Sequence, residues 1–121
     1  MDLNELLGRV EKRLLIGGVW RDASDGGTFD VENPATGERI ATLASATADD
    51  ATAALDAASA AQESWGRTPA RVRSDILREG FELVRAHGED LAWLMTTEMG
   101  KPLAEARGEV VYGNEFLRWF S

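Results

Sequence analysis

The sequence has no cysteine, one histidine and no long apolar run, and each shortage excludes a class of function. Without cysteine, the chain has no disulfide framework, no thiolate metal site and no catalytic thiol. The single histidine, His87, excludes a pair of histidine metal ligands and disfavours a histidine-based catalytic triad. No segment approaches the roughly 20 consecutive apolar residues that a membrane-spanning helix needs, so no membrane partner is expected.

The composition predicts one small globular domain. Of the 121 residues, 44% are hydrophobic and 28% are charged, a balance typical of a folded protein rather than a disordered one. The formal net charge of -8 opposes binding to nucleic acid or to an anionic membrane surface. Residues 1–13 repeat leucine and valine at helical spacing and carry acidic residues that a signal peptide would lack. We therefore expect an amphipathic helix or arm at residues 1–13 and a cytoplasmic protein.

Short strands are predicted between residues 14 and 45, separated by turn signals. Gly17-Gly18 and Ser24-Asp25-Gly26-Gly27 supply the positive φ angles that tight turns require. Asn33-Pro34-Ala35-Thr36-Gly37 is a third turn, because a residue before proline is pushed out of the helical region. Residues 39–43 alternate between polar and apolar side chains, as a half-buried strand does. The pattern predicts a small antiparallel β-hairpin sheet.

From Thr47 onward the apolar spacing becomes helical. Thr47 and Asp50 have the spacing of a capping box, in which each residue satisfies a backbone N–H of the other, and Gly66 is expected to end this helix. Thr68-Pro69 predicts the next start, with a capping hydroxyl followed by proline at the first helical position. Gly88 is predicted to terminate that second helix. Its expected buried face comprises Val72, Ile76, Leu77, Phe81 and Val84.

Two further helices complete the predicted α+β fold class, in which three to four helices follow the hairpin sheet. The third helix is expected to stop at Gly100, and the fourth begins after Lys101-Pro102. The fourth helix is apolar nearly all the way round, which is typical of a helix buried between other elements. It carries Val111, Tyr112, Phe116 and Trp119 besides its regular apolar stripe. Because this pattern stops at Ser121, we expect the chain to be truncated, with more protein following it.

No catalytic or cofactor-binding residue is predicted from local patterns. Gly108 and Gly113 have the spacing of a phosphate-binding loop but lie within a predicted helix and lack the following lysine. The paired glycines precede no helix, as a dinucleotide-binding fingerprint must. His87 is interpreted as a helix cap beside Gly88. The acidic pairs at residues 49–50 and 89–90 are interpreted as first-turn residues that favour the helix dipole.

Two longer motifs carry a more specific signal. Residues 33–38 read Asn-Pro-Ala-Thr-Gly-Glu, and residues 98–106 read Glu-Met-Gly-Lys-Pro-Leu-Ala-Glu-Ala. With their order along the chain, they resemble the amino-terminal end of the aldehyde dehydrogenase superfamily over residues 14–121. The ending GEVVYGNEFLRWFS is similar to the succinate-semialdehyde dehydrogenase branch in particular.

The resemblance implies an oxidoreductase that converts an aldehyde, here succinate semialdehyde, to the carboxylic acid with NAD or NADP. Residues 14–121 would form the amino-terminal part of the family's α/β Rossmann-type cofactor domain. The family uses a cysteine nucleophile, an asparagine at the oxyanion and a glutamate that activates water. Those motifs and the cofactor site would lie in the remainder of the enzyme chain, so this segment is expected to be inactive alone. The full-length enzyme would be a homodimer or homotetramer.

The resemblance also implies one site within the segment. Some family members hold a structural monovalent cation, and the matching ligands here are the backbone of Val31 and the carboxylate of Glu98. The alternative for Glu98 is a hydrogen bond within its own helix region. The alternative for the whole chain is a non-catalytic helical interaction module derived from such an enzyme, since an exposed apolar face often marks a partner surface.

Overall fold

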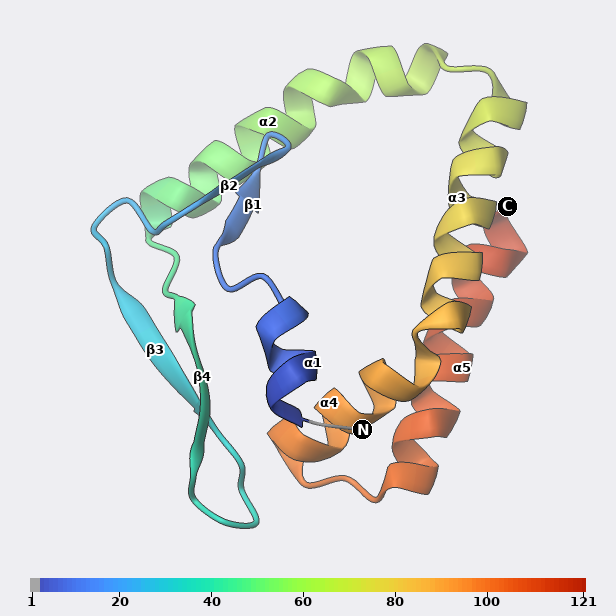
Figure 1. The fold of residues 1–121 in the computed structure, drawn as a ribbon. Helices are drawn as coiled ribbons and strands as arrows, with labels where there is room; N and C mark the ends of the chain where they lie inside the picture. Colours follow the sequence, from blue (N-terminus) through green and yellow to red (C-terminus); the bar gives the residue numbers. More distant parts are fainter. Residues whose placement is uncertain (1–2) are drawn as a thin grey trace. The chain divides into compact units, whose positions relative to one another are not determined.

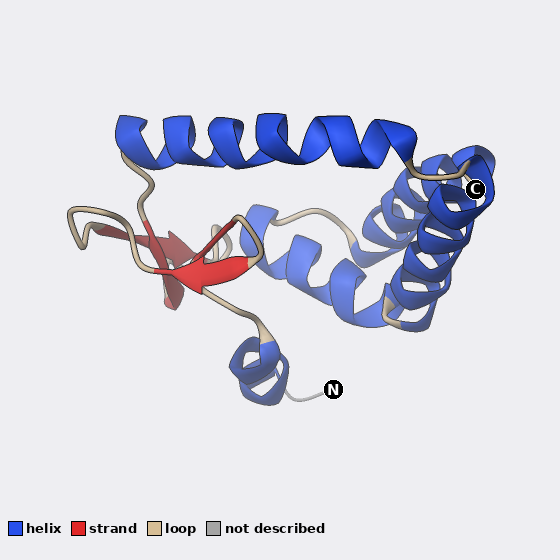
Figure 2. Ribbon diagram, turned by 90° about the horizontal axis from the view of Figure 1, so that it is seen from above, coloured by secondary structure: helices blue, strands red, loops and turns tan. Residues whose placement is uncertain are grey.

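The computed structural model describes residues 3–121, which form five helices and four strands (Figure 1). After one short helix, four strands precede four longer helices. Helices and strands are both present and lie in separate stretches of the chain, so the predicted α+β fold class is confirmed (Figure 2). The chain divides into two compact units. The first takes in the chain up to Glu32 together with Gly37–Arg67, and the second takes in Asn33–Thr36 and Thr68–Ser121. Within residues 3–121, no helix has both the length and the apolarity that crossing a membrane requires.

The strands of the first unit pair as two separate antiparallel hairpins rather than as one sheet. They follow helix α1 (Leu3–Arg9), and their bounds are β1 Leu14–Ile16, β2 Val19–Arg21, β3 Thr28–Glu32 and β4 Arg39–Ala44. Gly17 and Gly18 join β1 to β2 with φ angles of 61° and 80°, which residues with a Cβ atom rarely adopt. The predicted turn role of this glycine pair is confirmed. Residues 1 and 2 of the predicted amino-terminal arm lie outside the described residues.

Helix α2 (Ala48–Arg67) completes the first unit and contacts the first hairpin. A Cβ atom built on Gly17 would lie 3.8 Å from the Cβ of Ala57, so the hairpin turn approaches the helix closely. The predicted capping box is present at the start of α2. Asp50 N–H donates to Thr47 Oγ1 at 3.2 Å, and Thr47 N–H donates to Asp50 Oδ2 at 3.0 Å.

The second unit consists of three helices, α3 (Ala70–Ala86), α4 (Gly88–Met99) and α5 (Leu103–Phe120). Both views show α5 returning alongside α3 (Figures 1 and 2). The fully buried residues Ala92 on α4 and Ala106 on α5 are small, which allows these helices to approach closely. Gly80 of α3 also faces α5, where a Cβ atom would make an ordinary van der Waals contact with Leu117 Cδ1 at 3.8 Å.

The predicted helix boundaries fall within one or two residues of those observed. Helix α2 runs through Gly66 to Arg67. Pro69 is the N-cap of α3, with φ of -52° and ψ of 139°, so the helix begins at Ala70 and not at the proline. Helix α3 ends at Ala86, beside the predicted end, but Gly88 lacks the positive φ of a terminating glycine and is the first residue of α4. Gly100 does end α4 as predicted, in the left-handed conformation with φ of 73°.

Candidate functional site

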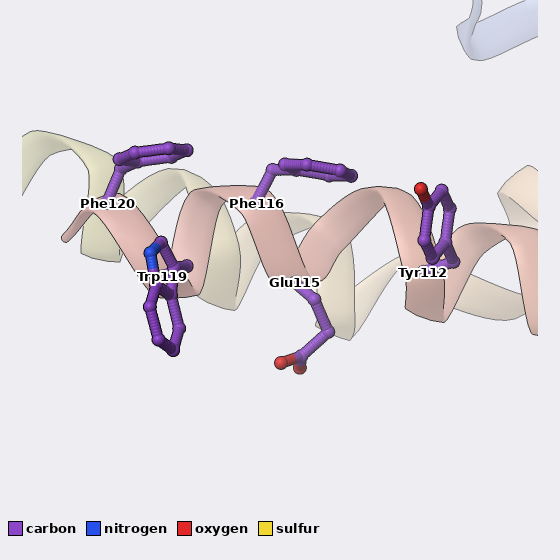
Figure 3. Close-up of a pocket in the computed structure, with 5 residues that line it drawn as sticks. All are labelled: Tyr112, Glu115, Phe116, Trp119 and Phe120. Carbon is purple, nitrogen blue, oxygen red and sulfur yellow. The ribbon is translucent and has the colours of Figure 1, made fainter.

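The principal candidate surface is one side of α5. Five residues line a shallow groove of about 370 Å³ there, and we call them the α5 face (Figure 3). They are Tyr112, Glu115, Phe116, Trp119 and Phe120. Phe116 and Phe120 project from one side of the helix, whereas Trp119 points away from them (Figure 3). Tyr112 and Phe116 pack edge to face, with ring centroids 5.4 Å apart.

The α5 face is exposed, contrary to the burial that its apolar pattern predicts. Trp119 is 77% exposed and Phe120 is 68% exposed. The helix turns its small residue Ala106 toward its neighbours in the second unit, which leaves the large rings on the outer side. Two of the five residues in the predicted buried face of α3 are also exposed, namely Val72 and Ile76. A soluble protein rarely leaves so many contiguous large apolar side chains in water unless they contact another surface.

The chemistry of the α5 face is that of packing rather than of catalysis. Its one ionisable carboxylate, Glu115, accepts a hydrogen bond from Arg118 Nε at 2.7 Å. That hydrogen bond, together with the positive charge of the Arg118 guanidinium, holds the pKa of Glu115 below its usual value. A carboxylate whose pKa is lowered by an ion pair is a poor proton donor, so Glu115 is not suited to act as a general acid.

A buried carboxylate network in the first unit was missed by the sequence patterns. The Asp50 side chain is fully buried and accepts hydrogen bonds from Arg21 Nη2 at 2.6 Å and from Ser24 N–H at 3.0 Å. The bonds from the Ser24 and Thr47 backbone N–H groups, and then from Arg21, hold the pKa of Asp50 far below its usual range. The network joins α2 to β2 and to the loop after β2. The carboxylate, the guanidinium and the hydroxyl groups of the network form hydrogen bonds with one another. We therefore interpret the network as stabilising the unit rather than binding a ligand.

The predicted cation ligands are found in different units. Val31 is half-buried on β3 of the first unit, and Glu98 is exposed near the end of α4 in the second. Because the two residues belong to different units, no distance between them tests the site, and the cation site stays a prediction. Within residues 3–121, no group of three or more acidic, histidine or cysteine side chains is arranged to hold a metal ion.

The remaining sequence candidates occupy structural positions. His87 caps the end of α3 as predicted and also precedes α4, with its Nδ1 3.5 Å from Asp90 Oδ2. Gly108 and Gly113 lie inside α5, which confirms their interpretation as helix residues. The glycine pairs lie in the turns that flank β2, and neither opens a helix.

Comparison with known proteins gives the geometry a family context. The chain matches the Aldehyde dehydrogenase family over residues 20–121. It is 72% identical over 82 residues to the succinate-semialdehyde dehydrogenase of Paenarthrobacter nicotinovorans, covering 68% of this chain and 18% of that protein. It is 46% identical over 110 residues to the NADP(+) succinate-semialdehyde dehydrogenase GabD of Escherichia coli K12, covering 91% of this chain and 23% of GabD.

The likeness extends to three dimensions. A crystal structure of betaine aldehyde dehydrogenase from Staphylococcus aureus, solved with NAD+, is similar with a TM-score of 0.92 and 31% identity. The match covers 98% of this chain and 24% of that structure. The chain thus spans about a fifth of the length of the curated relatives it matches.

Proposed function

The chain belongs to the aldehyde dehydrogenase family, and from that premise we propose that it is the amino-terminal part of an NAD(P)-dependent enzyme. The whole enzyme would oxidise succinate semialdehyde to the carboxylic acid. The substrate is suggested by the two succinate-semialdehyde dehydrogenases among the relatives, at 72% and 46% identity. The observation that carries the proposal for this segment is the exposed α5 face, which is suited to packing against further protein.

The proposed contribution of this segment is structural support. The remainder of the enzyme would cover the α5 face and would bury its aromatic rings, each worth roughly 1.5–3 kcal/mol when fully removed from water. A cofactor-binding β-layer is the occupant that the family resemblance suggests. We propose that the segment has no aldehyde dehydrogenase activity alone, because the chain contains no cysteine to act as the nucleophile.

NAD or NADP would be bound by the whole enzyme. A nicotinamide cofactor supplies the acceptor for the hydride that leaves the aldehyde carbon. No residue of this chain is assigned to it, since neither glycine pair lies between a strand and a following helix.

We further propose that the whole enzyme is a cytoplasmic homodimer or homotetramer. We also propose that the Val31 backbone and the Glu98 carboxylate are ligands of a structural monovalent cation in the whole enzyme.

A chimera tests the proposal. The segment of GabD that matches this chain is replaced by residues 14–121, and oxidation of succinate semialdehyde is followed by NADPH absorbance. We expect the chimera to be active, and both the isolated 121-residue chain and GabD without the segment to be inactive. A folded but inactive chimera, or turnover by the isolated chain, would contradict the proposal. The whole protein should also prefer succinate semialdehyde to betaine aldehyde in kcat/KM.

The exposed α5 face also supports a second function, that of a non-catalytic helical interaction module. Such a module would use the face for a partner other than an aldehyde dehydrogenase. The same chimera discriminates between the two, because a surface shaped for an unrelated partner has no reason to support GabD activity.

A further inference from the structure

The side chain of Asn114 carries a buried hydrogen-bond acceptor that lacks a partner. Asn114 lies on α5 and is 7% exposed. Its Nδ2 donates to the backbone oxygen of Phe81 on α3 at 3.1 Å, whereas its Oδ1 is buried and accepts no hydrogen bond from residues 3–121. Buried side-chain oxygens in native proteins almost always have a donor, because an unpaired one loses its bonds to water without replacement.

Asn114 also lines a second groove, of about 180 Å³, between α3 and α5. Its lining combines the apolar side chains of Phe81, Val110 and Val111 with the charged residues Arg85 and Glu115. Glu115 lines both this groove and the groove of the α5 face, so the two hollows are neighbours along one helix. A buried asparagine whose oxygen has no donor is costly, since valine or leucine would pack at this position without an orphaned oxygen.

We propose that Asn114 is a polar anchor for the protein segment that covers α5. This segment would belong to the part of the same aldehyde dehydrogenase polypeptide that lies beyond the residues matched here. Because Oδ1 is buried in the described chain, the amide would turn into the groove that Asn114 lines and would there accept an N–H or O–H of that segment. The inference rests on the proposed function. The relatives supply the reason for this occupant, because about four-fifths of their length has no counterpart in this chain. A buried acceptor at one position fixes the register of the covering segment, since a shifted segment would leave the oxygen unpaired.

The proposal predicts opposite effects of one substitution in two contexts. Leucine has a branched shape similar to that of asparagine but no polar atoms. In the isolated chain, Asn114→Leu removes the orphaned acceptor Oδ1 and also the hydrogen bond from Nδ2 to the Phe81 carbonyl. The second loss is small, because Phe81 lies inside α3 and its carbonyl can keep its helical hydrogen bond. The urea midpoint should therefore be unchanged or higher. In the covered protein, the same change leaves the donor of the covering segment buried without an acceptor, which destabilises the protein.

The experiment uses the GabD chimera described above, and the unsubstituted chimera is assayed first. Inactivity at that step is a failure of the proposed function and not of the anchor. With an active chimera, Asn114→Leu should speed thermal inactivation by roughly fivefold or more, the effect of losing a buried hydrogen bond. Equal effects in the two contexts, no effect in the chimera, or failure of the isolated variant to fold would overturn the proposal. It would also be overturned by a dimer of the isolated chain that Asn114→Leu dissociates in sedimentation, which would assign the groove to a second copy.

Discussion

Arg21 and Asp50 form an ion pair in which Nη2 donates to Oδ1 at 2.6 Å, with the carboxylate fully buried and the arginine side chain 40% exposed. The two residues are 29 positions apart and join β2 to the first turn of α2. Ser24 and Thr47 each donate to the other carboxylate oxygen, Asp50 Oδ2, through the backbone N–H and the side-chain hydroxyl. Both oxygens of the buried carboxylate therefore accept hydrogen bonds. This arrangement ties the start of α2 to β2 and to the loop that follows β2.

Thr47→Ala should destabilise the first unit. The change removes the acceptor for the Asp50 N–H and the contact of Thr47 Oγ1 with Ser24 Oγ at 2.8 Å. Loss of an N-terminal cap typically costs about 1 kcal/mol. Urea unfolding of the 121-residue chain, followed by circular dichroism, measures the difference. Thr52→Ala is the matched control on the same helix, because Thr52 Oγ1 bonds only to the Ala48 carbonyl and alanine is the better helix former. Equal losses for the two variants would show that the cap contributes nothing specific.

Stability should fall in acid because of Asp50. A carboxyl group whose pKa is lowered by folding stabilises the protein above its unfolded value, near 4, and this contribution is lost as the pH falls toward the folded value. The free energy of unfolding should therefore decline below about pH 5, and Asp50→Asn should make the decline shallower. Urea titrations at a series of pH values test this. Asp49→Asn, at the exposed neighbouring position, should keep the steeper decline. An Asp50→Asn chain with the unsubstituted pH profile would contradict the assignment.

Gly100→Ala should be more damaging than Gly37→Ala, although both glycines have φ of 73°. Either alanine bears the cost of a left-handed conformation, roughly 1–2 kcal/mol. A Cβ atom at Gly100 would also lie 3.2 Å from Pro34 Cγ, whereas one at Gly37 would meet nothing within 4 Å. Combining Gly100→Ala with Pro34→Ala should remove most of the excess in a double-mutant cycle of unfolding free energies. Additive effects would mean that Pro34 does not restrict the site.

Ala106→Leu should destabilise the second unit. Ala106 is completely buried on α5, and extra methylene groups in a close-packed site typically cost about 1–3 kcal/mol. Ala104→Leu, an exposed position two residues earlier on the same helix, is the control and should change the unfolding free energy by less than about 0.5 kcal/mol. A similar result for both variants would show that α5 is not held against its neighbours at Ala106.

Local signals in the sequence predicted local structure. Thr47 and Asp50 are three residues apart, and Gly100 needs only its own φ angle, so the capping box and the end of α4 could be recognised. The burial of Asp50 could not, because Arg21 and Ser24 reach it across 29 and 26 residues. Gly88 was misjudged for a similar reason. It begins α4 and faces Val110 of α5, 22 residues away, instead of ending α3 in a left-handed conformation.

The α5 face exposes a different limit of sequence patterns. The spacing of its aromatic residues predicts burial but does not say against what, and the described chain leaves them exposed. The missing partner of Asn114 Oδ1 is equally invisible in sequence, because it emerges only when α5 is placed beside Phe81, 33 residues away.

Trp119→Ala separates the stability of this chain from that of the proposed whole enzyme. Because Trp119 is 77% exposed, its loss should change the unfolding free energy of the isolated chain by no more than about 0.5 kcal/mol. In the GabD chimera, the same change should cost roughly 1.5–3 kcal/mol, since the covering segment would bury the indole. Arg118→Ala, next to it on the same turn, removes only an exposed ion pair and should have little effect in either context. Urea inactivation of the chimera measures the difference. If Trp119→Ala is as well tolerated in the active chimera as in the isolated chain, the indole is not covered there and α5 does not use this side to join the enzyme.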